Sequence, residues 1–180
     1  PPGSGPPGST TPSADGQPQR VVGAANGCDV VVPVVRGGLL KAKKGINLPG
    51  AKLSTPSVTE KDITELRAAL EANVDYVGLS FVRDPEDILR VKQLIGKVGS
   101  TARVIAKIEK PEAVAKIEQI IEVSDGIMVA RGDLGVEIPA EEVPVFQKRI
   151  IRLRNYHDRP LIVDTQKTES KMTDIAPNRA

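Results

Sequence analysis

The stretch 102–136, ARVIAKIEKPEAVAKIEQIIEVSDGIMVARGDLGV, decides the fold. It opens with a run of β-branched and small residues (ARVIAKIE), continues with a helical segment (PEAVAKIEQIIEVS) and returns to a second apolar run (GIMVA) that leads into a glycine-punctuated turn (RGDLG). Strand, helix and strand in this order predict a βαβ unit with parallel strands and a right-handed crossover.

The same alternation continues on both sides of this unit. Upstream, Thr59 is predicted to cap a helix over 59–72, which is followed by the strand DYVGLSFV. An amphipathic helix is then expected to begin at Asp84 or Pro85. Downstream, a helix over 141–158 precedes the strand PLIVDTQ. The sequence therefore predicts strand-and-helix units in series.

Four such units allow either an open doubly wound sheet or a (β/α) barrel. Charged residues at the ends of successive strands favour the barrel, because catalytic groups gather at the carboxyl-terminal rim of that fold. A closed barrel needs eight strands, and the pattern supplies about half of them. We therefore predict an α/β protein with a partial (β/α)8 TIM barrel.

The region before residue 45 has a different composition. Residues 1–19 are dominated by Pro, Gly, Ser and Thr, which predicts a flexible segment. Residues 20–44 contain short β-branched runs and the dipeptide Asn26-Gly27, so a small β unit with a hairpin at that turn is expected. Residues 45–180 would then form the partial barrel.

Composition excludes several classes of function. Aromatic residues make up only 2% of the chain, so the core must be built from Val, Ile, Leu and Ala. A net charge of +2 gives no reason to expect a nucleic acid or an anionic membrane as partner. Cys28, the single cysteine, allows no intramolecular disulfide. Without a membrane-length apolar run or signal-peptide features, we expect a cytoplasmic protein.

Charged residues mark the ends of two neighbouring strands. Lys107 and Glu109 are two residues apart on a predicted strand, so both side chains project to the same face. They form either a plain ion pair or part of a binding site, because buried charges require compensation. Asp133 follows Gly132 where the next strand turns. Together, Glu109 and Asp133 would suit Mg²⁺ in a phosphoryl-transfer site, whereas the alternative interpretation of RGDLG is a simple turn.

A set of motifs in a fixed order resembles the pyruvate kinase family. They are GGLLKAKKGINLPG, TEKD, DYVGLSFVR, AKIEK, SDGIMVARGDLGVEIP, VPVFQK and TQ..ES, and the similarity runs from about Asp15 to Ala180. The resemblance implies phosphoryl transfer from phosphoenolpyruvate to ADP, giving pyruvate and ATP in the last step of glycolysis. It also implies that residues 20–44 are a remnant of an inserted β lid domain on the nucleotide side.

The resemblance assigns roles to residues at the strand ends. Lys107 matches the catalytic, substrate-binding lysine that stabilises the enolate, and a fixed ammonium in a dry pocket would do so electrostatically. Glu109 and Asp133 match the magnesium ligands. The backbone amides of Gly132 and Asp133 match those that bind the substrate carboxylate, helped by the hydroxyl of Thr165.

The resemblance also implies cofactors and partners. Lys44 matches a nucleotide-contacting lysine of the lid, although a solvated basic loop is the other interpretation. Mg²⁺, or Mn²⁺ in its place, is the expected metal. K⁺ is expected for the family, but its ligands come from segments that this chain does not contain. Phosphoenolpyruvate or pyruvate and ADP or ATP are the expected ligands, and the family is usually homotetrameric.

Some positions depart from the family pattern. Where the family shows ATQMLESM, polar or charged residues replace apolar ones at Asp164, Lys167, Thr168 and Lys171. Lys110 replaces an asparagine, and QPQR stands where the family has a strand of alternating apolar residues, so a frayed strand or none is expected there.

Three hypotheses follow. The chain is a truncated or degenerate pyruvate kinase polypeptide, a non-catalytic fragment that binds Mg²⁺ or associates with other chains, or a metal-dependent aldolase or lyase of the related phosphoenolpyruvate/pyruvate barrel superfamily. The segment GGLLKAKKGINLPG argues against the last hypothesis, because an aldolase needs no ADP.

Overall fold

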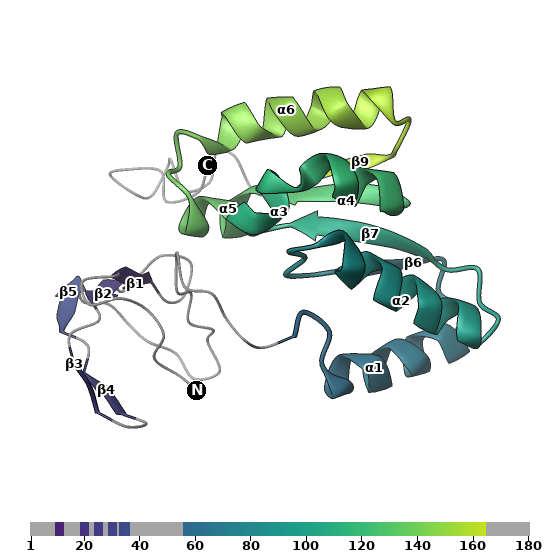
Figure 1. Cartoon of the computed structure of the whole chain (residues 1–180), viewed down its shortest axis with the longest axis horizontal. Coiled ribbons are helices and arrows are strands. Elements are labelled where there is room, and N and C mark those ends of the chain that lie inside the picture. The colour runs from purple at the N-terminus through teal and green to yellow at the C-terminus, as the bar shows by residue number, and fades with distance from the viewer. Residues whose placement is uncertain are drawn as a thin grey trace.

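The structure, a computed structural model, describes residues 10–12, 19–21, 24–26, 29–31, 33–36 and 56–164. Its main sheet has four parallel strands in the order β6 (Tyr76–Leu79), β7 (Arg103–Ile108), β8 (Gly126–Ala130) and β9 (Leu161–Asp164). Neighbouring strands follow chain order without the reversal of a doubly wound sheet. The predicted α/β fold, with four parallel strands alternating with helices as in part of a barrel, is confirmed (Figure 1).

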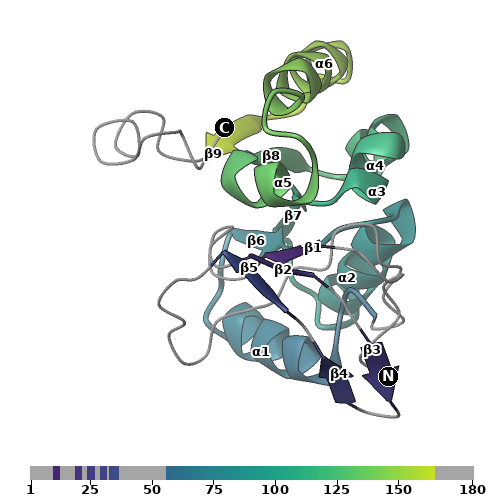
Figure 2. The same cartoon turned by 90° about the vertical axis from the view of Figure 1, so that its left-hand side faces the viewer.

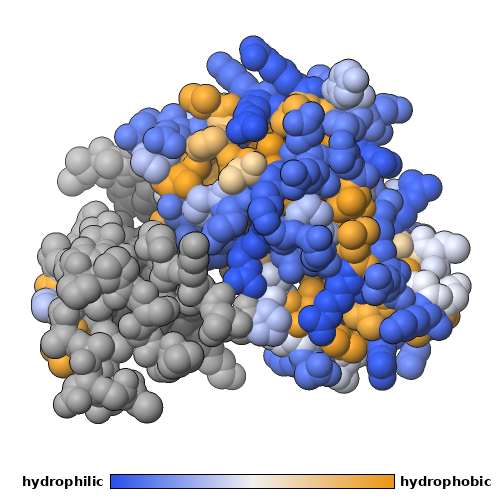
Figure 3. All heavy atoms as spheres, in the orientation of Figure 1, coloured by the Kyte–Doolittle hydropathy of each residue, from blue (hydrophilic) through white to orange (hydrophobic). Residues whose placement is uncertain are grey.

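Helices separate and cover these strands. Their bounds are α1 (Glu60–Glu71), α2 (Pro85–Lys97), α3 (Pro111–Ala115), α4 (Ile117–Val123), α5 (Arg131–Glu137) and α6 (Val143–Tyr156). Helix α4 packs between α2 and α6, and the three lie along one side of the sheet (Figures 1 and 2). Their visible outer surface is mostly hydrophilic, with hydrophobic patches between (Figure 3). None of the helices in the described ranges is long and apolar enough to cross a membrane.

The helix starts predicted at Thr59 and at Asp84 or Pro85 are confirmed. The Thr59 hydroxyl accepts a hydrogen bond from the Asp62 amide at 3.2 Å, and the Asp62 carboxylate accepts one from the Thr59 amide at 2.8 Å. Asp84 caps α2 in the same reciprocal way, with Pro85 in the first turn. These caps satisfy amide groups that have no partner within a helix.

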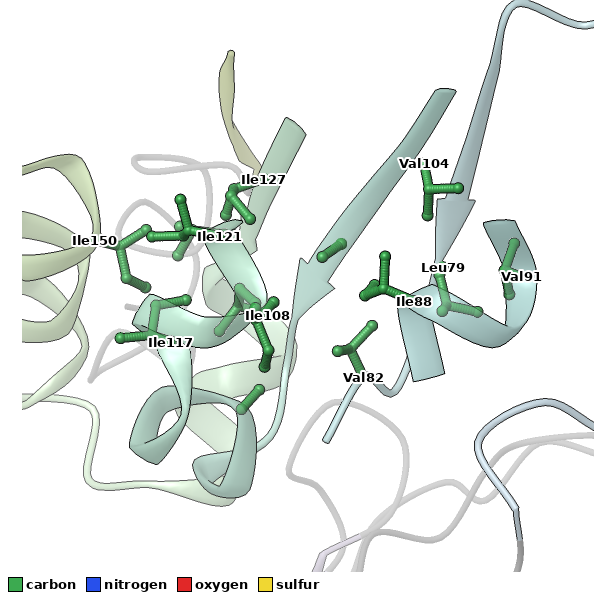
Figure 4. Close-up of a cluster of buried hydrophobic side chains, with 14 of the residues drawn as sticks. Leu79, Val82, Ile88, Val91, Val104, Ile108, Ile117, Ile121, Ile127 and Ile150 are labelled. Atoms are coloured by element: carbon green, nitrogen blue, oxygen red, sulfur yellow. The ribbon is translucent and has the colours of Figure 1, made fainter. Parts of the chain in front are cut away.

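The core is aliphatic and lies between the sheet and the helices. Figure 4 shows two groups of buried side chains, one near α2 and one near α4 and α6, to which β7 contributes Val104 and Ile108 respectively. The labelled members are Leu79, Val82, Ile88, Val91 and Val104 in the first group, and Ile108, Ile117, Ile121, Ile127 and Ile150 in the second.

The two faces of strand β7 differ in burial. Val104, Ala106 and Ile108 are fully buried, whereas Ile105 and Lys107 are half-buried on the other face. The alternation predicted around Lys107 is therefore confirmed.

The β-rich region forms two small antiparallel units. Strands β1 (Thr10–Pro12), β2 (Gln19–Val21) and β5 (Val34–Arg36) form one sheet, with β2 in the middle. Strands β3 (Ala24–Asn26) and β4 (Asp29–Val31) pair with Asn26 opposite Asp29, which confirms the predicted hairpin. QPQR, expected to hold a frayed strand or none, is not without a strand: Gln19 and Arg20 pair on both sides within the three-residue β2, with a register shift between them.

Two local predictions are also wrong. The helix expected over PEAVAKIEQIIEVS is divided at Lys116 into α3 and α4. RGDLG, expected as a turn, begins the short helix α5 despite its glycines. Burial explains the second difference, because Leu134 is fully buried and holds this turn against the core, which offsets the low helix propensity of glycine.

Candidate functional site

The candidate site lies at the carboxyl ends of β6, β7 and β8. Ser80 and Phe81 follow β6, Glu109 directly follows β7, and α5 directly follows β8. Parallel strands bring these three connections to one edge of the sheet, which is where barrel enzymes carry their chemistry.

Lys107 and Glu109 form a compact polar cluster at this edge. The Lys107 Nζ atom lies 2.7 Å from Oε1 of Glu109 and donates a hydrogen bond to Ser80 Oγ at 2.9 Å. The other carboxylate oxygen of Glu109 accepts a hydrogen bond from the Phe81 amide at 3.1 Å. Only 3% of the Glu109 side chain is exposed, so these contacts compensate a carboxylate that has lost its water.

Gly132 and Asp133 lie in the first turn of α5, on the next strand connection. The Asp133 side chain is exposed, and within residues 56–164 its carboxylate has no hydrogen bond or ion pair. In contrast, both carboxylate oxygens of Glu109 are engaged. Within the described residues Asp133 thus keeps its carboxylate for a ligand, whereas Glu109 would have to share its contact with Lys107.

The donor set suits a hard divalent cation. No group of three or more His, Cys, Asp or Glu side chains that could hold a metal occurs in the described part of the chain. Glu109 and Asp133 offer two carboxylates from adjacent strand ends. Mg²⁺ commonly binds one or two carboxylates and completes its octahedron with water and substrate oxygens. The residues present therefore fit Mg²⁺ better than zinc.

A second ion pair lies behind this cluster. The Lys110 Nζ atom is 2.6 Å from Oε1 of Glu137, and the two side chains are only 14% and 5% exposed. The same ammonium lies 5.7 Å from the centroid of the Phe81 ring. The sequence analysis assigned no role to Ser80, Phe81 or Glu137. Only their positions could have indicated one, because Ser80 and Phe81 follow a strand and Glu137 stands four residues after Asp133.

The remaining predicted residues divide into two groups. Arg131 is buried at the start of α5. Asp164 ends β9 opposite Ala130 and is exposed, so the charge at this position incurs no burial cost. Lys44, Thr165, Lys167, Thr168 and Lys171 lie outside the described residues.

A different lysine–carboxylate pair occupies the amino ends of the strands. Asp125, just before β8, lies 2.7 Å from Lys92 Nζ and accepts a hydrogen bond from the Val104 amide at 2.8 Å. Partial burial raises the pKa of Asp125, but the bonds from Lys92 and Val104, with the charges of Lys92 and Arg159, outweigh it and hold this pKa below its ordinary value.

Comparison with known proteins gives a consistent family. The family profile described as "Pyruvate kinase, barrel domain" matches residues 6–180. The chain is 49% identical over 166 residues to a pyruvate kinase of Mycobacterium intracellulare, covering 92% of this chain and 35% of that protein. It is 45% identical over 173 residues to a pyruvate kinase of Thermotoga maritima, covering 96% of this chain and 37% of that protein.

A pyruvate kinase of Geobacillus stearothermophilus is 44% identical over 153 residues, covering 84% of this chain and 26% of that protein. The chain thus spans about a third of the length of the first two relatives and about a quarter of this one. A profile match over nearly the whole chain establishes its ancestry. The chain belongs to the pyruvate kinase family.

Proposed function

We propose that the chain serves phosphoryl transfer from phosphoenolpyruvate to ADP, with the Lys107–Glu109 cluster at the reacting end of the substrate. The observation that carries the proposal is an ammonium group fixed by a buried carboxylate at 2.7 Å and by Ser80 at 2.9 Å. This ammonium group lies at the carboxyl edge of the parallel sheet, in a chain that belongs to the pyruvate kinase family.

Lys107 acts through charge. When the phosphorus–oxygen bond of phosphoenolpyruvate breaks, negative charge develops on the oxygen that becomes the enolate of pyruvate. A positioned ammonium stabilises this charge most strongly where water is excluded, because little reorganisation is then needed. Contacts with Ser80 and Glu109 restrict the Lys107 side chain in advance.

Glu109 and Asp133 would hold Mg²⁺, or Mn²⁺ in its place. When bound, the ion would supply positive charge that offsets the negative charge on the phosphoryl and enolate oxygens. The amides of Gly132 and Asp133, together with the Thr165 hydroxyl, bind the substrate carboxylate in this proposal, and Lys44 contacts the nucleotide. K⁺, which the family uses, would be held by residues outside this chain.

A non-catalytic Mg²⁺-binding fragment is the second candidate. It is favoured by two observations: the chain spans 35% of the length of one relative, and within the described part β6 pairs only with β7.

The proposed domain organisation is a flexible segment over residues 1–19, a lid remnant over residues 20–44 and a partial barrel over residues 45–180. Membership of the pyruvate kinase family disfavours an aldolase or lyase.

A coupled assay tests the proposal. Purified chain is mixed with phosphoenolpyruvate, ADP, Mg²⁺ and K⁺, and pyruvate is followed with lactate dehydrogenase and NADH. We expect turnover that needs ADP and that falls by at least about 100-fold in Lys107→Ala, in line with the loss of one electrostatic catalytic group.

The outcomes separate the candidates. Folded chain that shows no turnover, but binds Mn²⁺ in a way that Glu109→Gln and Asp133→Asn both weaken, supports the fragment. Pyruvate release that does not require ADP contradicts kinase activity. Turnover unchanged in Lys107→Ala contradicts the role given to this residue.

A further inference from the structure

We infer that Lys110 is a positioning residue: with its largely buried partner Glu137 and the exposed Phe81 ring it forms a clamp that turns the Asp133 face of α5 toward the end of β7. The inference depends on the proposed function only for the identity of the ion held by Glu109 and Asp133. The clamp itself follows from contacts between three consecutive strand connections.

The first observation is the burial of the Lys110–Glu137 pair. The two side chains are 14% and 5% exposed, whereas those of the Lys61–Glu65 pair on the surface of α1 are 82% and 64% exposed. A charge withdrawn from water in this way tolerates little movement, because losing its partner leaves it unpaired in a poorly solvated place. The pair therefore fixes the distance between Lys110 and the end of α5.

The second observation is the place of each partner in its element. Glu137 is the last residue of α5 and stands four positions after Asp133. Residues four apart lie on the same face of a helix, one turn above each other. A tether at Glu137 that points to Lys110 therefore also turns Asp133 toward the end of β7, where Glu109 immediately precedes Lys110.

The third observation connects the clamp to the loop after β6. The Lys110 ammonium lies 5.7 Å from the Phe81 ring centroid, a favourable cation–π distance. The Phe81 amide donates to Glu109 at 3.1 Å, and Phe81 has a φ of 55° that a non-glycine residue adopts only under local constraint. Lys110 thus supports the group that orients Glu109 as well as the helix that carries Asp133.

Two measurements on the full chain test the clamp. The first is amide hydrogen exchange of residues 131–137, which reports local opening without any ligand. The second is Mn²⁺ affinity by electron paramagnetic resonance. In Lys110→Met we expect about 10-fold faster exchange of these amides and about 10-fold weaker Mn²⁺ binding, the size typical of losing an outer contact of a metal site. Lys110→Arg keeps the charge and should restore both within about 2-fold of the wild-type chain.

Lys92→Met is the matched control. It removes the lysine of the Lys92–Asp125 ion pair at the opposite end of the sheet. It should change neither the amide exchange of residues 131–137 nor the Mn²⁺ affinity. The double variant Lys110→Met/Glu137→Met leaves no unpaired buried charge, so it provides the same test if Lys110→Met does not fold.

The outcomes are distinguishable. Faster exchange in Lys110→Met that is confined to residues 131–137 supports the clamp. If this result is found but the wild-type chain binds no Mn²⁺, the clamp stands and the proposed metal site is wrong. Unchanged exchange of these amides in both the single and the double variant overturns the clamp. Equal effects of Lys110→Met and Lys92→Met also overturn it, because they would reveal general destabilisation.

Discussion

The two ends of the parallel sheet carry nearly the same arrangement. At the carboxyl end, Lys107 lies 2.7 Å from Glu109, whose other oxygen accepts a backbone amide. At the amino end, Lys92 lies 2.7 Å from Asp125, which also accepts a backbone amide. Local geometry alone therefore does not distinguish the pair proposed to be catalytic from the other one.

Burial and position distinguish the two pairs. The carboxylate side chain is 3% exposed in Glu109 and 27% exposed in Asp125. Glu109 follows β7, and the exposed Asp133 follows the neighbouring strand β8. Asp125, in contrast, precedes β8 and binds Lys92 of α2. In barrel folds the carboxyl edge carries chemistry and the amino edge carries stability. Breaking each pair in turn should make this difference measurable.

Lys107→Met should have the largest effect on stability. It leaves the Glu109 carboxylate almost fully buried with only the Phe81 amide as partner, and we expect a loss of about 3 kcal/mol in the free energy of unfolding. Urea denaturation measures this value. Lys107→Met/Glu109→Met should recover most of the loss, and a single-variant cost below about 1 kcal/mol would contradict the importance of burial.

Lys92→Met should cost less. Asp125 keeps the Val104 amide and enough exposure to regain water, so we expect a loss of about 1 kcal/mol by the same denaturation measurement. A cost equal to that of Lys107→Met would erase the distinction between the two ends.

The pH dependence of stability should isolate Asp125. Its folded pKa lies below its ordinary value of 3.8, so its stabilising contribution is present above that value and is lost as pH falls through the folded pKa. The stability difference between wild-type chain and Asp125→Asn should therefore be larger at pH 6 than at pH 3. A difference that grows toward acid pH would give the wrong sign for a carboxylate stabilised in its ionised form.

Lys61→Met should have the smallest effect. The Lys61–Glu65 pair is 3.4 Å long and mostly exposed, so removing it should change the free energy of unfolding by no more than about 0.5 kcal/mol. Together with the two preceding lysine variants it gives a series in which the cost follows the burial of the carboxylate partner. A larger cost here than for Lys92→Met would break that series.

Sequence reasoning found the elements of this comparison unevenly. The alternation of strands and helices, the caps at Thr59 and Asp84, and the shared face of Lys107 and Glu109 follow from patterns within a few residues. The helix α5 was missed because the burial of Leu134 depends on residues distant in sequence.

The clamp was missed for a similar reason. Lys110 and Glu137 are 27 residues apart, and only the parallel pairing of β7 and β8 brings them together. The contact of Ser80 with Lys107 likewise depends on the pairing of β6 and β7. Periodicity predicts which face of a strand a side chain occupies. Its contact partner on a neighbouring strand is instead set by the pairing register and by the path of the loop or helix that follows each strand.

The most direct test is the ADP-dependent turnover of phosphoenolpyruvate by wild-type chain, Lys107→Ala and Lys92→Ala, measured where circular dichroism shows all three to be folded. We predict turnover in wild-type chain and Lys92→Ala, and a loss of at least about 100-fold in Lys107→Ala. Equal losses in the two variants, or no turnover by folded wild-type chain, would contradict the assignment of catalysis to the carboxyl end of this sheet.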